Sequence, residues 1–130
     1  MAPIFLSHAE ILEIHQAQIS RYGGSAGLRD AGVLDSAIAQ PMATFGGQRL
    51  HADLFEMAAA YLFHIVENHP FVDGNKRTGT VAARVFLLLN DYELKAPQES
   101  LVNHVLSVAS GNTTKAEVTD FLRENSSPIN

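Results

Sequence analysis

The sequence predicts an all-α protein built as one compact domain, residues 1–130, with about six helices. Apolar residues recur at helical spacing in most segments, which indicates amphipathic or buried helices. Ser7 with Glu10, and Thr114 with Glu117, have the spacing of capping boxes, a local signal for a helix start. No segment has a convincing strand pattern apart from a possible small hairpin near residue 45, so the fold class is all-α.

Composition limits the classes of function. Hydrophobic residues make up 46% of the chain and charged residues 18%, a globular rather than disordered composition. There is no cysteine, which excludes disulfides and thiolate metal sites and suits a reducing compartment, so we expect a cytoplasmic protein. No signal peptide or membrane-spanning run is visible, so no membrane association is expected. A net charge of −5 argues against direct nucleic-acid binding, although Lys76 and Arg77 could attract a compact anion.

Local signals place the helix ends. Asp30 and Asp53 are suitable N-caps, and Pro97 suits the first turn of a helix. Pro41 and Gly111 are suitable stops. We therefore expect helices at about residues 7–21, 30–40, 53–68, 75–90, 97–110 and 114–125.

Three shorter segments connect or follow these helices. Residues 42–50 contain Gly46-Gly47 and form either a small hairpin or an irregular loop. Such a segment can be a flap that positions a substrate, or a mere connector, and the sequence leaves both open. Residues 92–96 are expected to be a connector, and residues 126–130 a frayed tail.

Five histidines lie outside the most polar stretch of the chain. His8 and His15 are seven residues apart, a poor spacing for a shared metal ion, and are predicted to be surface or interface residues. His51, His64 and His104 have no motif around them and are predicted to be structural.

The stretch from His69 to Gly79, His-Pro-Phe-Val-Asp-Gly-Asn-Lys-Arg-Thr-Gly, is the strongest candidate for a functional site. Gly74 suits a turn, and Asp73 or Asn75 could cap the helix that follows. Capping alone does not require an imidazole and two cations in the same turn. A polar cluster between two apolar helices is costly to build for stability alone, so we expect it to be functional.

The chemistry expected of this stretch is phosphate binding. A helix that begins near Asn75 directs unpaired backbone N–H groups and the positive end of its dipole toward the preceding loop. Gly74 would let an anion approach the backbone closely. Lys76 and Arg77 lie in the first turn, where a cation is intrinsically unfavourable, and a bound polyphosphate would resolve that conflict.

Asp73 and His69 extend this site toward group transfer. One carboxylate beside a phosphate site suits Mg²⁺, which commonly binds through one or two carboxylates plus substrate phosphates. An imidazole accepts a proton near neutral pH, so His69 suits a general base acting on a hydroxyl. Phe71 is expected to anchor the loop on the core. The residues alone predict metal-assisted transfer of a phosphate-containing group to a hydroxyl.

The same stretch resembles the motif of the Fic/Doc family, H-x-F-x-[D/E]-G-N-G-R-x-x-R. The residues that match are His69, Phe71, Asp73, Gly74, Asn75 and Arg77. Lys76 replaces the second motif glycine, and Thr80 stands where the second arginine belongs. Both departures are those of the Doc (death-on-curing) branch, whose motif is close to H-x-F-x-D-A-N-K-R-T. The resemblance also takes in Gly27-Leu-Arg-Asp and extends over essentially the whole chain.

The resemblance implies a role for each matching residue. It implies His69 as the base for the target hydroxyl and Asp73 as the magnesium ligand. It implies a phosphate-binding turn made by Gly74, Asn75, Lys76 and Arg77, and a flap at residues 42–50 over the target peptide.

The resemblance to the Doc branch also implies an activity and two partners. Doc proteins transfer the terminal phosphate of ATP to a threonine of elongation factor Tu, which arrests translation. The inhibitory helix that some family members carry has no match here, because the nearest candidate, Thr113–Glu117, is followed by Val118. The resemblance therefore implies control in trans by a Phd-like antitoxin whose disordered tail folds into a groove.

Two other functions remain open from the sequence. The same fold could transfer AMP, as classical Fic proteins do, or it could be a catalytically silent module that binds an anion or a partner. Lys76 favours phosphate transfer, because its bulk and charge replace the glycine of the AMP-transferring members.

Overall fold

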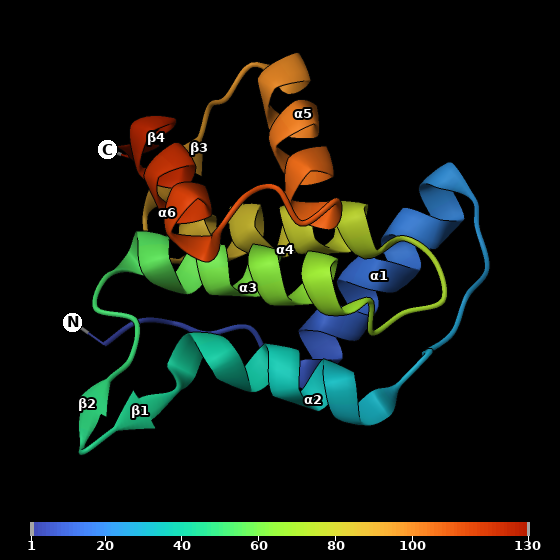
Figure 1. Ribbon diagram of the computed structural model, residues 1–130, viewed down its shortest axis with the longest axis horizontal. Helices are drawn as coiled ribbons and strands as arrows, with labels where there is room; N and C mark the ends of the chain where they lie inside the picture. The colour runs from blue at the N-terminus through green and yellow to red at the C-terminus, as the bar shows by residue number, and fades with distance from the viewer. Residues whose placement is uncertain (1, 130) are drawn as a thin grey trace.

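The computed structural model describes residues 2–129 and confirms the all-α class (Figure 1). Helices α3 and α4 run side by side through the middle of the molecule, and the remaining helices surround them. The elements are α1 (His8–Tyr22), α2 (Ala31–Ala39), a 3-10 turn (Gln40–Met42), β1 (Thr44–Phe45), β2 (Gln48–Arg49), α3 (Leu54–Asn68), α4 (Asn75–Leu89), β3 (Tyr92–Leu94), α5 (Gln98–Ala109), α6 (Lys115–Glu124) and β4 (Ser126–Pro128).

Four helices, α1, α2, α3 and α6, begin at the caps predicted from local sequence. The side chains of Ser7 and Thr114 each accept a backbone N–H bond three residues on, and the glutamates at those positions bond back to the cap, so both capping boxes are confirmed. Asp30 and Asp53 cap α2 and α3 in the same way. These signals are reliable because a cap needs only residues close together in the chain.

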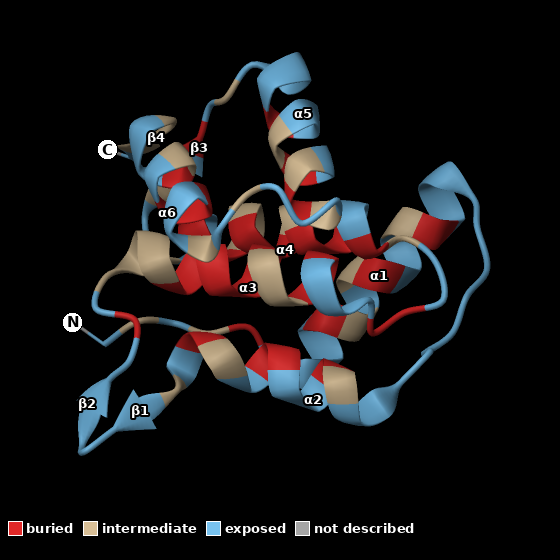
Figure 2. Cartoon of the chain, viewed as in Figure 1, coloured by how far each residue is buried: buried red, intermediate tan, exposed pale blue. Residues whose placement is uncertain are grey.

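The core lies between α3 and α4, where Figure 2 shows burial concentrated along both helices. Ala58, Ala59 and Ala60 of α3 are completely buried, as expected for close helix packing. Gly79 of α4 lies directly against α3. A Cβ atom there would lie 2.8 Å from Cγ2 of Val66 and 3.2 Å from the backbone oxygen of Leu62, so no side chain fits. Gly79 is therefore a packing residue.

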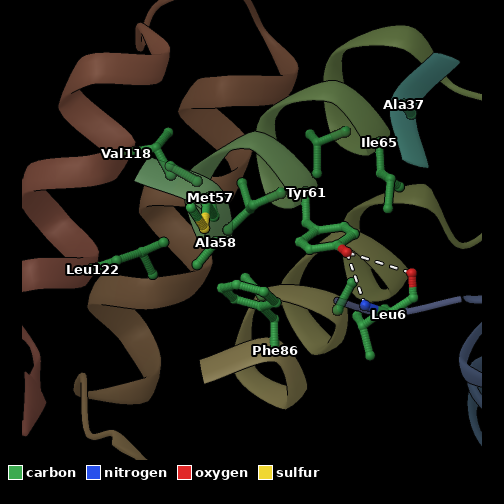
Figure 3. Close-up of a cluster of buried hydrophobic side chains, with 14 of the residues drawn as sticks. Leu6, Ala37, Met57, Ala58, Tyr61, Ile65, Phe86, Val118 and Leu122 are labelled. Atoms are coloured by element: carbon green, nitrogen blue, oxygen red, sulfur yellow. Dashed lines mark hydrogen bonds between the residues drawn. The ribbon is translucent and has the colours of Figure 1, made fainter. Parts of the chain in front are cut away.

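Tyr61 ties the N-terminal segment to this core. Its hydroxyl accepts the backbone N–H of Leu6 at 2.9 Å, and the ring is fully buried beside Phe86 (Figure 3). Burial raises the pKa of Tyr61 to about 12, so the phenol stays neutral and keeps its hydrogen-bonding role.

The C-terminal segment corrects two predictions. Residues 92–96 were expected to be a connector and residues 126–130 a frayed tail, but Ser126–Pro128 pairs antiparallel with Tyr92–Leu94. Flanking backbone bonds from Lys95 to Asn125 and from Ile129 to Asp91 extend this contact. Each strand has only three residues, too few for a periodic signal, and pairing partners distant in sequence supply the order. Asn130 lies outside the described residues.

Of the two forms expected for residues 42–50, the structure has the small hairpin, but its position is not beside the His69 stretch. β1 and β2 pair through Phe45 and Gln48 around Gly46-Gly47, just before α3 begins. His69 follows the other end of α3, a helix of 15 residues and therefore about 22 Å long. Figure 1 shows the hairpin and the α3–α4 loop at opposite ends of that helix. The expectation of a flap over the site at residues 42–50 is therefore wrong in its position.

Two contacts join α6 to the beginning and middle of α3. The Lys115 ammonium lies 3.1 Å from Nε2 of both His51 and His64. Arg123 of α6 forms a 2.8 Å ion pair with Asp53, the cap of α3. We call the first contact the Lys115 joint, and it gives His51 and His64 the structural role expected for them.

Burial, followed by the Lys115 charge, lowers the pKa of both histidines in this joint, to about 4 for His64. His104, the third histidine predicted to be structural, stacks on Phe121 with 4.2 Å between ring centroids. No helix within residues 2–129 has both the length and the apolarity that a bilayer crossing requires.

Candidate active site

The candidate site is the loop between α3 and α4. His69 ends α3 in the left-handed conformation, with φ 50° and ψ 60°, and its side chain is exposed. Pro70 explains why α3 ends here, because a proline disfavours the right-handed helical conformation in the residue before it. The imidazole therefore projects from a sharp corner rather than from the helix itself.

Arg29, which is far from His69 in the sequence, fixes the backbone at the end of α3. Its guanidinium donates to the carbonyl oxygens of His69 and Asn68, the second at 2.7 Å. These are carbonyls at the end of α3, which have no partner within the helix. One planar side chain with several donors thus fixes the backbone that carries the imidazole.

The segment from Ser25 to Asp30, which we call the strap, runs along the loop and is bonded to it. The backbone N–H groups of Arg29 and Asp30 donate to the Pro70 oxygen, and Val72 N–H donates to the Gly27 oxygen. Leu28 and Phe71 form an isolated antiparallel bridge within this contact. The strap, and not the β1–β2 hairpin, is the segment that lies beside His69.

Asn75 has a different role from the capping role considered for it. Its carboxamide accepts Phe71 N–H and donates to Phe71 C=O, both at 2.9 Å, and the residue is buried. The side chain thus closes the loop, and only its backbone N–H is left for a ligand. Neither Asp73 nor Asn75 caps α4, because the N-cap position is Gly74, with φ 80°.

His15 is a site residue that sequence reasoning missed. It was predicted to lie at the surface or an interface, but only 4% of it is exposed. Its ring stacks on Phe71 with 3.8 Å between centroids, and Nε2 donates to the Asp73 backbone oxygen at 2.8 Å. A Cβ on Gly74 would lie 3.6 Å from the His15 ring, so His15 and Phe71 support the turn from beneath.

The beginning of α4 presents donors and cations together. The first hydrogen bond within α4 runs from Thr78 N–H to Gly74 C=O. The backbone N–H groups of the three residues between them therefore have no acceptor within the helix. Lys76 and Arg77 are both exposed. The Arg77 guanidinium lies 4.6 Å from the centroid of the Tyr22 ring, a cation–π contact that orients it. This is a suitable place for a phosphate group.

Asp73 has one oxygen engaged. Its Oδ2 accepts the backbone N–H of Ser25 at 2.9 Å, and the side chain is exposed. Within residues 2–129 there is no group of three His, Asp or Glu side chains placed to hold a metal ion. A single carboxylate beside a phosphate site fits Mg²⁺ bound largely through a substrate, and it does not fit a protein-built metal cage.

A groove of about 550 Å³ opens beside these cations. It lies between α1, α4 and α5, and Lys76, Arg77 and Tyr22 are at its edge. The site is therefore an exposed corner that continues into a groove.

Comparison with known proteins assigns this chain to a family. The model described as the Fic/DOC family matches residues 5–87, which include α1, the strap, α3, the loop and most of α4. The chain belongs to the Fic/DOC family.

Two curated relatives agree with this assignment. The chain is 35% identical over 118 residues to "Protein kinase doc" of Escherichia phage P1, covering 91% of this chain and 92% of that protein. It is 43% identical over 89 residues to "Toxin Doc" of Mycolicibacterium smegmatis, covering 65% of this chain and 68% of that protein.

The Fic/DOC motif accounts for part of this site. The predicted residues His69, Asp73, Gly74, Asn75, Lys76 and Arg77 all lie in the one loop and the first turn of α4. The motif does not contain His15, Ser25 or Arg29, which hold the loop from α1 and the strap. Arg29 lies in the Gly27-Leu-Arg-Asp segment of the resemblance, so a signal for it was present in the sequence.

Proposed function

We propose that this chain is a Doc-type toxin that transfers the terminal phosphate of ATP to a hydroxyl of a protein target. The observation that carries the proposal is Lys76 in the first turn of α4, beside unpaired backbone N–H groups and Arg77. The likeness to proteins named as a Doc kinase and a Doc toxin supports it.

In the proposed reaction, some residues of the site bind phosphate and one accepts a proton. Backbone N–H groups at the start of α4, with Lys76 and Arg77, bind the phosphate oxygens. His69 takes the proton of the target hydroxyl while the hydroxyl oxygen attacks the γ phosphorus. The bond from the γ phosphorus to the bridging oxygen breaks and ADP leaves. Arg29 is a positioning residue, because it acts only through the backbone of His69.

Asp73 is the residue that would hold Mg²⁺. The ion, when bound with the nucleotide, neutralises charge on the phosphate oxygens. Ser25 leaves Oδ1 of Asp73 free for that purpose, since its N–H bonds to Oδ2. Asp73 would thus supply one ligand to the ion.

The target segment is proposed to lie against the strap. The C=O of Gly27 and the N–H of Arg29 bond to the loop. Backbone groups alternate in direction along an extended strand, so the N–H and C=O of Leu28, which lies between them in the antiparallel bridge, point away from the loop. That outer edge can accept an extended peptide. Leu28 is 42% exposed, and its side chain supplies apolar contact beside the bridge. A threonine of elongation factor Tu is the proposed acceptor.

Inhibition is proposed to come from a separate Phd-like antitoxin. Within residues 1–130, no segment matches the family's inhibitory helix pattern. The likeness to a protein named Toxin Doc supports control by a separate partner that binds the chain in trans.

Labelled ATP tests the reaction. Magnesium-ATP labelled at either the α or the γ phosphate is offered with elongation factor Tu, and the protein-bound label is measured. Label from the γ position alone is the expected result. Label from the α position would instead support AMP transfer, the second candidate, which the shared fold permits.

His69→Ala is the matched control for that experiment. It should abolish transfer while the protein stays folded, because the side chain is exposed. Absence of transfer by the unaltered chain, with no effect of His69→Ala on growth inhibition, would exclude both enzymatic functions and leave a silent binding module.

A further inference from the structure

A pocket of about 350 Å³ opens between α1 and the strap, and we call it the strap pocket. It shares no lining residue with the groove beside Lys76 and Arg77, so the phosphate chemistry proposed above leaves it unused. Figure 2 shows the strap exposed along its length, so this wall of the pocket faces solvent. The strap pocket is therefore open to a ligand other than the nucleotide.

The floor of the strap pocket belongs to the same structure that supports the His69 loop. Phe71 and His15 both line the pocket, both are buried, and their rings stack with 3.8 Å between centroids. Phe71 lies two residues after His69, so the Cα atoms of these residues are at most about 7 Å apart. A side chain that enters the pocket is therefore held close to the imidazole.

Leu28 and Phe71 show which way a bound target side chain would point. They are directly opposed in the antiparallel bridge, and both line the strap pocket. Directly opposed residues of neighbouring strands place their side chains on the same face. A target segment paired with the outer edge of the strap therefore directs the residue opposite Leu28 toward this pocket. Successive residues of such a segment are about 3.3 Å apart, so a hydroxyl beside His69 belongs to a residue about two positions away.

The walls of the pocket are apolar except at one edge. Leu12 of α1 and Leu28 of the strap supply apolar surface. Glu13 is the one lining residue with a carboxylate, and neither Lys nor Arg lines the pocket. Glu13 is exposed and forms no ion pair with any residue that the structure describes. An apolar pocket with one unpaired carboxylate at its edge suits a side chain with an apolar stem and a cationic end.

We propose that the strap pocket selects the protein target by binding a lysine or arginine side chain about two residues from the hydroxyl that receives the phosphate. The stem of that side chain packs on Leu28 and Phe71, and its cationic end reaches Glu13. Glu13 is thus a specificity residue, which contacts the target but not the reacting atoms. The inference rests on the proposed function, since it requires a target segment that lies against the strap.

Equilibrium binding of short peptides to His69→Ala protein tests the pocket. The probes have one central threonine in an alanine–glycine background, with a guest residue two positions before or after it, because the segment can run in either direction. The guests are lysine, norleucine, which lacks the ammonium group, and glutamate. The lysine peptide should bind about fivefold or more tighter than the glutamate peptide, with norleucine between them.

Charge reversal identifies the residue responsible. Glu13→Lys should invert the order, so that the glutamate peptide binds best. The matched control is Glu124→Lys, the same change of charge at the exposed last residue of α6 and outside the pocket, and it should keep the original order. Leu28→Asn should weaken binding of the lysine and norleucine peptides by about threefold or more, because apolar contact is lost while the strap backbone is unchanged.

Three results would overturn the proposal. One is equal affinity for the three guests in protein that retains Glu13, and another is the absence of binding by every peptide. The third is the same inversion in Glu124→Lys as in Glu13→Lys, which would assign the preference to net charge rather than to the pocket.

The two proposals fail in different ways. Selection of the lysine peptide by His69→Ala protein, when the unaltered chain transfers no phosphate, would refute the proposed function and leave the strap pocket assignment standing. Phosphate transfer to all three peptides with equal kcat/KM would do the reverse.

Discussion

Arg29 shows how much a single residue contributes to this site from outside the motif. It lies forty positions before His69 in the chain, yet its guanidinium binds the two carbonyls at the corner that carries the imidazole. The bonds are to backbone, so Arg29 determines where the imidazole is without contacting it. A residue of this kind affects the rate of a reaction more than the binding of its substrate.

Replacing Arg29 by alanine should therefore lower kcat about 10- to 100-fold, because a displacement of about 1 Å in a catalytic group can cost that much. KM for ATP should change by less than about threefold, since the phosphate turn is not altered. Steady-state phosphorylation kinetics measure both. Arg29→Lys should recover part of kcat. Arg49→Ala, which removes an arginine lying over the Phe5 ring, is the control. A rise in KM with unchanged kcat would contradict the positioning role.

Lys76 is the second residue on which a prediction depends. Lys76→Gly restores the glycine of the AMP-transferring Fic motif. If Lys76 sets the orientation of the nucleotide, γ-phosphate transfer should fall about tenfold or more while ATP binding persists, because Arg77 and the N–H groups of α4 remain. Transfer of γ label and equilibrium ATP binding are measured side by side, with Lys95→Gly as an exposed control. Unchanged transfer would show that Lys76 is only a surface charge.

At the scale of the elements, the contact of α3 with α4 is the most tightly constrained part of the fold. Gly79 lets the two helices approach, and the loop that carries His69 connects their ends. Any change that separates these helices also moves the ends of that loop. The packing of the core and the geometry of the site are therefore linked.

Gly79→Ala should destabilise the protein by about 1–3 kcal/mol, because the added methyl meets Val66 and the Leu62 backbone oxygen. This is opposite in sign to the intrinsic preference of a helix for alanine over glycine, about 1 kcal/mol. Gly32→Ala in α2 is the matched control, since its Cβ would meet only Asp30 at 3.4 Å, and it should be neutral or slightly stabilising. Urea unfolding gives both values. Equal effects at the two positions would contradict the packing role.

The same elements show what the sequence could predict. The caps of α1, α2, α3 and α6 were predicted correctly, because a cap such as Ser7 with Glu10 lies within four consecutive residues. The pairing of β3 with β4 was missed, because strands of three residues have no periodic signal. The buried position of His15 was also missed, since its partners Phe71 and Asp73 are far along the chain. The sequence identified the loop and its chemistry, but not the contacts that hold the loop.

At the scale of the whole molecule, the Lys115 joint makes folding sensitive to pH. Lys115 of α6 donates to His64 of α3 and to His51, which precedes α3, so three segments meet at one ammonium. Glu56 is the acidic residue that acts on this group, and it raises the pKa of Lys115 and His51 less than burial lowers them. A second positive charge in this place is therefore unfavourable.

Stability should fall as pH decreases from 7 to 5. The pKa of His64 is about 4 in the folded protein, against 6.5 for an ordinary histidine. Between these values the unfolded chain binds a proton that the folded protein does not, so acid favours unfolding. Linkage gives a loss of about 2 kcal/mol from His64 between pH 7 and 5, and solvent screening of this half-buried group reduces it toward about 1 kcal/mol. Urea unfolding at both pH values measures it.

His64→Gln is the matched variant, because glutamine can still accept a hydrogen bond from Lys115 but does not titrate. It should remove most of the pH dependence that His64 contributes, while His8→Gln at the exposed surface should not. An equally steep pH dependence in His64→Gln would show that the joint is not its source.

The bonds between the strap and the loop have one further consequence, for how this sequence tolerates mutation. At Asn68, His69, Pro70 and Val72 the strap binds only backbone atoms, and any amino acid other than proline supplies the same atoms at position 72. The Val72 side chain is 52% exposed, so its identity is nearly free in the folded protein. Saturation mutagenesis should find position 72 permissive between two restrictive neighbours, Phe71 and Asp73. Position 72 is also one of the unspecified positions of the family motif, and a site held by its main chain can vary there without losing its shape.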